Sequence, residues 1–310
     1  MVSRRDAQAS GIYQVTSLDP QQTAEVLGAL ERRLTSLEQT VLQLIEGPAA
    51  PYLVLTYPEP IATSLAREQS AAHYHEKFFS LLDVGETSVR YIAALVLAVL
   101  CDGASPPIPL RLMGAPISLG SWAGLVAESS ESLRASRSEF AEHVTTGLFR
   151  SSGKPTPANR LLLSEFVNLR NRERGHGSAR PEGVYEGLYR RHVSEIHDSL
   201  KSLPFLNLPL VRVEQINFAG GTIQYDLKVL MGPSPMGRIE TARCSKQVSR
   251  GETCLWDWGE ELLALDGLLS YVVCDECGAE HTFFLDQATT KAAHYYTYST
   301  NHRIERPPIH

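Results

Sequence analysis

The chain has 310 residues, of which 43% are hydrophobic and 21% are charged, as in an ordinary globular protein. Its formal net charge of −6 excludes nucleic-acid binding through overall charge, so any contact with RNA needs a local basic cluster. The five cysteines are irregularly spaced and predict no disulfide framework. No apolar segment follows residues 1–5, and the longest apolar run, 91–101, is about half a membrane span. We therefore expect a cytoplasmic protein without a signal peptide or membrane contact.

The N-terminal part of the chain predicts a loose segment and then a helical arm. Residues 1–19 are polar and carry no periodicity. An Asp-Pro pair at residues 19–20 marks a helix start, and leucines together with Val41 then recur at steps of three and four residues until Gly47 ends the pattern. This spacing predicts either an amphipathic helix that packs on its own domain or a short coiled-coil arm that pairs two subunits. We assign residues 20–60 to this arm and a proline-rich connector.

Residues 61–206 have the pattern of a helical bundle. Apolar side chains recur at helical spacing in four segments, which are separated by linkers that contain proline, glycine and serine. Four helices with such linkers favour an up-and-down bundle. The predicted helices cover about residues 64–100, 118–149, 158–172 and 182–203.

After Pro204 the pattern changes to an alternation of apolar and polar residues, which is typical of strands. A Gly-Gly pair at 220–221 lies between two such segments and predicts a hairpin. The sequence therefore predicts an α+β fold, in which an N-terminal helical arm and a four-helix bundle precede a small β-rich C-terminal domain, residues 207–310. The predicted strands cover residues 211–216, 222–227, 268–273 and 281–285.

The end of the third predicted helix carries residue types that suit RNA cleavage. Cleavage without a metal needs a base for the 2′-OH proton, an acid for the leaving 5′-oxygen and a cation for the phosphorane. Histidine titrates near neutral pH, and the planar fork of arginine suits a phosphate. If the helix unwinds near Gly175, Arg170 and His176 can reach one spot, with Asn171 beside the arginine. The further cations expected to bind RNA are Arg172, Arg174 and Arg180.

This segment resembles the motif of the HEPN superfamily, in which an Arg and a polar residue precede a His at the end of the third helix of a four-helix bundle. The resemblance covers about residues 65–205. Many members are metal-independent endoribonucleases of toxin–antitoxin and antiviral defence systems, and they act as dimers with a composite site. The resemblance implies that His176 is the general base or acid, that Arg170 binds the scissile phosphate and that Asn171 positions it.

The resemblance also implies a homodimer that binds RNA and needs no cofactor for catalysis. Some HEPN toxins carry a tyrosine two residues after the histidine, which a partner antitoxin can nucleotidylate. Ser178 occupies that position here, so this kind of control is not expected.

Two alternatives stay open. Arg170 and Asn171 can simply lie at a helix C-terminus, where cations suit the helix dipole, with His176 on a loop. The second alternative is a non-catalytic HEPN-like adaptor that dimerises and whose β-rich domain binds a regulatory protein partner. For Glu86 we favour a surface i,i+4 pair with Arg90 over a contact with the Arg170 cluster.

Cys274 and Cys277 form a CxxC turn of the kind that binds structural zinc. A closed site needs two further ligands, so the sequence leaves open a bound zinc or a metal-free turn. The other candidate ligands are Cys244 and Cys254, which nine residues separate, and His281, His294 and His302. The aromatic residues of the C-terminal segment, Tyr298 among them, are expected to form the packing face of a terminal strand rather than to stack on bases.

Overall fold

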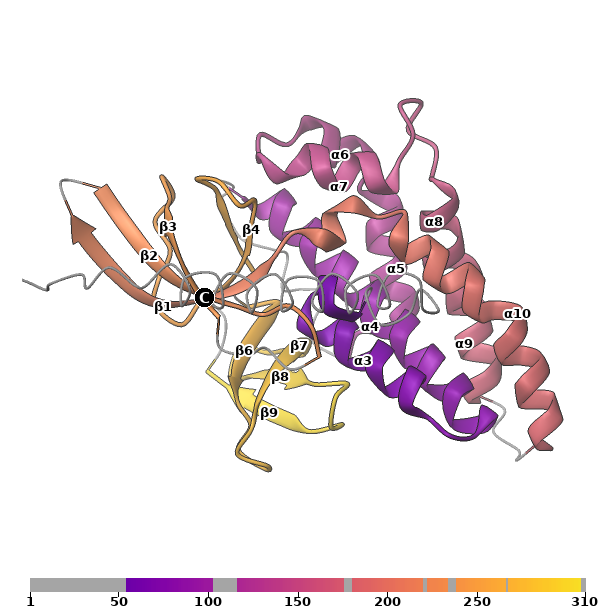
Figure 1. Cartoon of the computed structure of the whole chain (residues 1–310). Helices are drawn as coiled ribbons and strands as arrows, with labels where there is room; N and C mark the ends of the chain where they lie inside the picture. The colour runs from indigo at the N-terminus through magenta and orange to yellow at the C-terminus, as the bar shows by residue number, and fades with distance from the viewer. Residues whose placement is uncertain are drawn as a thin grey trace, which may run out of the picture. The chain divides into compact units, whose positions relative to one another are not determined.

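The computed structural model describes six stretches of the chain, and all of them belong to one compact unit, residues 52–310 (Figure 1). The predicted loose segment 1–19, nearly all of the predicted arm and connector, and His176 lie outside the described residues. The described stretches are residues 54–102, 116–175, 180–219, 222–233, 238–265 and 267–307.

Helix α4 (Tyr74–Cys101) is the centre of the helical part. It packs against α3 (Glu59–Ser70), α5 (Leu119–Glu128) and α10 (Glu182–Lys201). Within the described stretches it is the one helix long and apolar enough to cross a membrane, and 89% of its most apolar window is buried inside the unit. Such burial is typical of the core helix of a globular unit.

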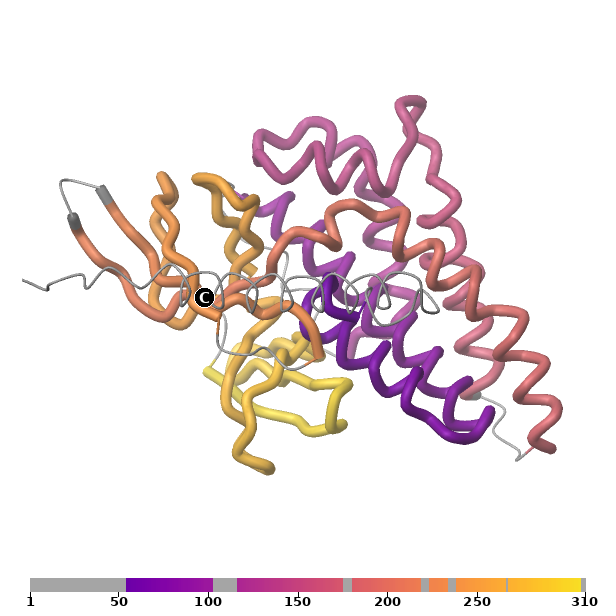
Figure 2. Tube along the Cα trace, in the orientation of Figure 1, coloured from indigo at the N-terminus to yellow at the C-terminus, as the bar shows by residue number. Residues whose placement is uncertain are grey.

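The predicted helix 64–100 is two helices, α3 and α4. The backbone becomes extended at Ala71, with φ −62° and ψ 134°. No glycine or proline marks this break in the sequence. The turn lets α3 fold back along α4 and bury Ile61 and Leu65, so that tertiary packing overrides local helix propensity (Figure 2).

The predicted helix 118–149 is three helices, α5, α6 (Ser130–Ala135) and α7 (Phe140–Leu148). Serine side chains compete with the helical backbone bonds at both breaks. The hydroxyl of Ser129 donates to the carbonyl of Val126 at 2.7 Å, and Ser138 Oγ accepts the amide of Phe140 at 3.4 Å.

The third predicted helix, 158–172, is longer than expected and irregular. It consists of α8 (Pro157–Arg160), a π-helical turn η2 (Leu161–Glu165) and α9 (Phe166–Gly175). A π-helical turn adds a residue to the helix and so changes the face that the next segment presents, and such turns are frequent at functional sites. The turn therefore helps to set the direction in which α9 presents its side chains.

The C-terminal part contains two antiparallel sheets (Figure 1). The first has the order β3-β2-β1-β4-β5 and the second the order β6-β7-β8-β9. In the predicted hairpin, Ala219 pairs with Thr222, and the turn residues 220–221 lie outside the described stretches. After η3 (Pro204–Asn207), the strands are β1 (Leu210–Ala219), β2 (Thr222–Val229), β3 (Ile239–Arg243), β4 (Thr253–Trp256), β5 (Leu262–Ala264), β6 (Leu269–Val273), β7 (Glu280–Ala288), β8 (Ala293–Tyr296) and β9 (Arg303–Arg306).

One hydrophobic cluster joins the helices to the second sheet. It contains Leu95 of α4 and Phe166 of α9 together with Phe283 of β7 and Tyr298 of the turn after β8. The first sheet has a cluster of its own, which includes Tyr225. The predicted α+β class, helical first and β-rich afterwards, is confirmed, and the shared core explains why groups from α4, α9 and the second sheet can meet.

Candidate functional site

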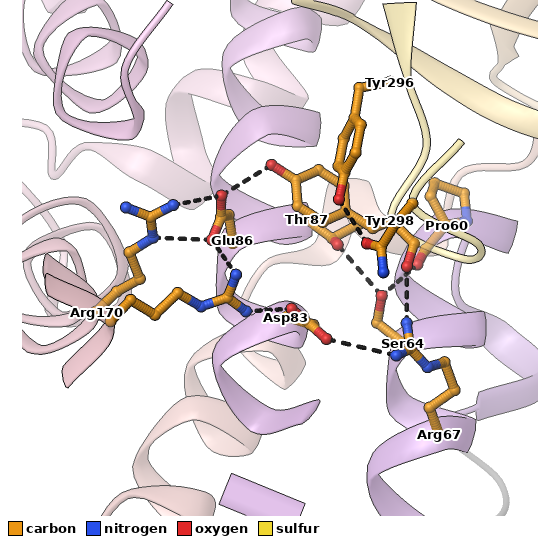
Figure 3. Close-up of polar contacts among 11 residues, drawn as sticks. Pro60, Ser64, Arg67, Asp83, Glu86, Thr87, Arg170, Tyr296 and Tyr298 are labelled. Carbon is orange, nitrogen blue, oxygen red and sulfur yellow. Dashed lines mark hydrogen bonds and ion pairs between the residues drawn. The ribbon is translucent and has the colours of Figure 1, made fainter. Parts of the chain in front are cut away.

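Arg170 lies on α9 with its guanidinium against the carboxylate of Glu86 on α4 (Figure 3). Its Nε donates to Oε2 at 2.9 Å and its Nη2 donates to Oε1 at 3.0 Å, so the pair is bidentate. The third nitrogen, Nη1, donates to Oδ1 of Asn171 at 3.2 Å. The Arg170 side chain keeps 28% of its surface exposed, whereas Glu86 keeps 4%. The guanidinium is therefore held in one plane at the protein surface.

Glu86 is a buried carboxylate that several donors stabilise. Tyr298 donates its hydroxyl to Oε1 at 3.0 Å, and Arg174 Nη1 lies 3.5 Å from Oε2. Burial alone raises the pKa of Glu86, but the hydrogen bond from Arg170 and the charges of Arg174 and Arg170 outweigh it, and the pKa is lowered. Glu86 is therefore ionised at neutral pH and pairs with a permanently charged arginine.

Asp83, one turn before Glu86 on α4, extends the same cluster (Figure 3). Arg174 donates to Asp83, and Arg67 of α3 lies 3.7 Å from Asp83 Oδ2. Arg67 also donates to the main-chain carbonyl of Tyr298 at 2.7 Å. Burial lowers the pKa of Arg174, but the nearby carboxylates of Asp83 and Glu86 outweigh it and raise the pKa. Groups from α3, α4, α9 and the turn after β8 therefore meet at two carboxylates.

Arg172 and Arg180 belong to a second group, which is centred on Glu173. Arg172 Nε lies 2.9 Å from one carboxylate oxygen of Glu173, and Arg180 Nη1 lies 2.7 Å from the other. The Glu173 side chain is 5% exposed, while those of Arg172 and Arg180 are 60% and 33% exposed. One buried carboxylate thus holds two arginines that keep part of their charge in solvent.

The predicted catalytic residues are brought together only in part within the described chain. Arg170 and Asn171 share a hydrogen bond, and Arg174 meets Arg170 through Glu86. Helix α9 ends at Gly175, and His176 lies outside the described residues. The approach of His176 to Arg170 stays a prediction.

The favoured prediction of a surface pair between Glu86 and Arg90 was wrong. Arg90 donates Nη1 to Asp286 of β7 at 3.4 Å, and its guanidinium carbon lies 5.6 Å from the centre of the Tyr298 ring. Both Glu86 and Arg90 are buried and find partners on other elements, which a rule for exposed helix neighbours does not consider.

Asp83, Arg67 and Tyr298 were not predicted as parts of the site. A signal for Asp83 exists, because it and Glu86 lie three residues apart in a largely apolar helix and so share a face. The arginines at 170 and 174 lie four residues apart and also share a face. Two acidic residues on one face of α4 and two arginines on one face of α9 predict a contact between the two faces.

A second group of reactive side chains lies at one end of the second sheet. Ligand atoms of Cys274, Cys277 and His302 all lie within 4.8 Å of one another. Cys274 Sγ is 3.2 Å from His302 Nδ1, and Cys277 Sγ is 3.5 Å from His281 Nε2. Gly278 has φ 72°, which lets the turn after β6 close with a 2.9 Å bond from its amide to the carbonyl of Cys274.

The other candidate ligands lie elsewhere. Cys244 and Cys254 belong to the buried cluster of the first sheet, and His294 Nδ1 lies 3.7 Å from the carboxylate of Glu305. Burial raises the pKa of Cys244 to about 11. Since the thiolate is the form that binds a metal, this environment is unfavourable for a ligand.

Cys274 has the opposite environment from Cys244. Burial raises the pKa of the Cys274 thiol, but the backbone amides of Cys277 and Glu276, with His302, outweigh it and lower the pKa. Burial and the charge of His302 lower the pKa of His281, so its imidazole is neutral at physiological pH. Thiolates and neutral imidazoles are the forms that coordinate metals.

No family model, curated protein or solved structure matches the chain. A function is therefore argued from the geometry and from the motif. At the first site, the chain presents an oriented guanidinium, an adjacent amide and half-exposed arginines, a set of donors that suits an anionic group such as a phosphodiester.

Proposed function

We propose that this protein is a HEPN-type, metal-independent endoribonuclease that uses Arg170, Asn171 and His176. The observation that supports this most is the bidentate pair of Arg170 with buried Glu86, because it fixes the plane of the guanidinium on α9, the helix whose last residue directly precedes His176 in the sequence. A defence or toxin role follows from the HEPN resemblance alone.

The proposed reaction is attack of the RNA 2′-oxygen on the neighbouring phosphorus, with departure of the 5′-oxygen. One His176 takes the 2′-OH proton or protonates the leaving oxygen. Arg170 binds the non-bridging oxygens, and its charge stabilises the phosphorane. Asn171, whose carbonyl oxygen accepts a bond from Arg170, keeps its amide NH₂ for the substrate. The products are a 2′,3′-cyclic phosphate and a 5′-hydroxyl.

The carboxylates do not cancel the positive charge of the site. Across the two groups, five arginines pair with three acids, namely Asp83, Glu86 and Glu173. Arg172 and Arg180 retain exposed surface from which they can contact the RNA backbone. A local positive potential in a chain of net charge −6 is the distribution that RNA binding requires.

A homodimer belongs to the proposal, because one copy of the motif supplies one histidine and the reaction uses both a base and an acid. Two motifs that face each other across a dimer axis provide both. The β-rich part is then available to a regulatory protein partner. Light scattering of the full chain at assay concentration tests the dimer, and an active monomer contradicts this part.

The test is cleavage of single-stranded RNA in magnesium-free buffer with EDTA. Wild-type protein should cut, His176→Ala should lose about 10²–10⁴-fold in rate, and Arg170→Ala about 10²–10³-fold. Arg170→Lys should also be impaired, since it keeps the charge and loses the fork. His143→Ala and Arg191→Ala change exposed residues of the same types and should leave the rate unchanged. Wild-type protein that is inert on varied RNAs overturns the proposal.

One observation favours a second candidate function. Glu86 occupies two of the three nitrogens of Arg170 and is also bonded to Tyr298, so the pair can serve mainly to join the helices to the second sheet. The protein is then a non-catalytic dimerising adaptor. In that case Arg170→Ala lowers the free energy of unfolding, and wild-type protein cuts no RNA.

A further inference from the structure

We propose that two cysteines and two histidines at the end of the second sheet bind one zinc ion, a site beyond the proposed ribonuclease function. Two ligands come from the turn between β6 and β7, one from the start of β7 and one from the turn between β8 and β9. Three ligands are Cys274, Cys277 and His302, whose ligand atoms lie within 4.8 Å of one another. The fourth is His281, assigned from the 3.5 Å contact of its Nε2 with Cys277 Sγ.

The separation within each cysteine–histidine pair fits a tetrahedral ion. Zinc–sulfur bonds of about 2.3 Å and zinc–nitrogen bonds of about 2.0 Å place the two kinds of ligand about 3.5 Å apart. The two cysteine–histidine pairs lie 3.2 Å and 3.5 Å apart. Two thiolates with two imidazoles favour zinc, whereas magnesium and calcium require oxygen ligands.

The second nitrogen of each imidazole has an outer partner. His281 Nδ1 lies 3.1 Å from Ser299 Oγ, and His302 Nε2 lies 3.8 Å from a carboxylate oxygen of Glu276. The carboxylate of Glu276 is itself held by the amide of Arg303 at 3.2 Å. Histidines that bind zinc usually have such partners, which fix the ring and leave the other nitrogen to the metal. In both rings the nitrogen that faces the sulfur is the one left available.

The two turns that carry the ligands are closed by residues in the left-handed region. Gly278 has φ 72° and follows Cys277, and Asn301 has φ 63° and precedes His302. The amide of Asn301 donates to the carbonyl of Thr297 at 3.0 Å. The backbone of each turn therefore presents its ligand before any metal binds, which lowers the entropy lost on coordination.

The ion would join the turn after β6 to the turn after β8. The second turn also contains Tyr298, which donates to Glu86 and whose carbonyl accepts Arg67. Zinc would therefore hold in place the loop that stabilises the carboxylate of the Arg170 site. Removal of the metal should loosen this loop, although the metal takes no part in the chemistry at Arg170.

The test is the metal content of the full chain, purified without chelator and without a metal-affinity resin. Wild-type protein should contain about one zinc per chain. The variants Cys277→Ser, His281→Ala and His302→Ala should each bind zinc at least about tenfold more weakly. The matched control is His294→Ala, because His294 lies on β8 of the same sheet and outside the ligand group, and it should keep the zinc.

A second measurement does not depend on the folding of a variant. Metal-stripped wild-type protein is titrated with Co²⁺, and the expected absorption is that of a tetrahedral ion with two thiolates, displaced by one equivalent of Zn²⁺. Wild-type protein that takes up neither ion overturns the proposal. Full zinc content in the Cys277→Ser variant also overturns it, and full content in His281→Ala overturns the assignment of the fourth ligand.

The zinc and ribonuclease proposals fail separately. Zinc content and spectrum report on the metal whether or not RNA is cut. In the RNA assay, the zinc content of the protein is measured after exposure to EDTA. The variant His294→Ala, which should keep the zinc, is included as the control. If the protein loses cleavage in EDTA and regains it when Zn²⁺ is added, the loss is attributed to loosening of the turn after β8. If protein that contains zinc does not cleave RNA, only the ribonuclease proposal is overturned.

Discussion

Tyr298 and Glu86 lie 212 residues apart in the chain, and the tyrosine hydroxyl donates a 3.0 Å hydrogen bond to the glutamate carboxylate. The tyrosine lies in the turn after β8, and the glutamate lies in the middle of α4. Through this bond the second sheet supports the carboxylate that orients Arg170. A buried charge that loses one of its partners is costly, so the contact makes measurable predictions.

Tyr298→Phe should lower the free energy of unfolding by about 1.5–3 kcal/mol, because a hydrogen bond to a buried charged acceptor is lost. Burial raises the pKa of Tyr298, so its hydroxyl is a donor at neutral pH. The control is Tyr296→Phe, whose hydroxyl donates to Asn301 at an exposed position and should cost less than about 1 kcal/mol. Urea denaturation measures both, and equal losses contradict the role of Tyr298.

Glu86→Gln should be less stable than wild type at neutral pH by about 2–4 kcal/mol, and the difference should shrink in acid. The pKa of Glu86 in the folded protein is below its ordinary value of 4.5. The stability from the charged pair is therefore present above 4.5 and lost as the pH falls through the folded pKa. Urea unfolding at neutral and acidic pH tests this, with the exposed Glu142→Gln as control. A pH-independent difference contradicts the account.

Glu59→Gln should have the opposite dependence on pH. Burial raises the pKa of Glu59 from 4.5 to about 7. Because the folded protein keeps this proton to a higher pH than the unfolded chain does, the free energy of unfolding of the wild type falls as the pH rises from about 4.5 through about 7. Above that range it falls no further from this cause. The glutamine variant lacks this loss. The free energy of unfolding of the variant minus that of the wild type should therefore be greater near pH 8 than near pH 4, by on the order of 3 kcal/mol. Urea unfolding of the wild type and the variant across this pH range tests the prediction, and the same pH dependence in both proteins contradicts it.

Gly85→Ala should destabilise the protein and impair the Arg170 site. A Cβ at Gly85 would lie 2.4 Å from the ring of Phe166, the first residue of α9, so α9 would have to move away from α4. Such overpacking costs about 1–3 kcal/mol. The matched control is Gly124→Ala in α5, where the new Cβ meets nothing within 4 Å, and it should be neutral or stabilising by up to about 1 kcal/mol. Thermal unfolding compares them, and similar melting temperatures contradict the close contact.

The helical character of the first part, the first hairpin and the strands at 268–273 and 281–285 could be predicted because their hydrophobic periodicity is local. The break at Ala71 could not be predicted, because it depends on the packing of α3 against α4. Strands β4 and β5 were also missed, since short strands that are buried on both faces show little alternation of polar and apolar residues.

The sequence indicated Arg170 and Arg174 of the first site and the cysteines of the second, but not Arg67. It did not indicate Tyr298, whose contact with Glu86 requires the tertiary fold. It also offered several histidines as zinc ligands without a means to choose among them. The pairing of β7, β8 and β9 brings His281 and His302 to the same end of the sheet, and His294 faces Glu305 instead.

The most direct test of RNA cleavage at Arg170 and His176 compares an RNA oligonucleotide with the same sequence carrying 2′-deoxyribose, in EDTA, with the metal content of the protein verified. The proposed chemistry predicts that only the RNA is cut, with 2′,3′-cyclic phosphate and 5′-hydroxyl ends. It also predicts that His176→Ala slows the cut by about 10²–10⁴-fold while His143→Ala keeps the wild-type rate. Cleavage of the deoxy strand, or equal cleavage by the His176→Ala variant, would contradict it.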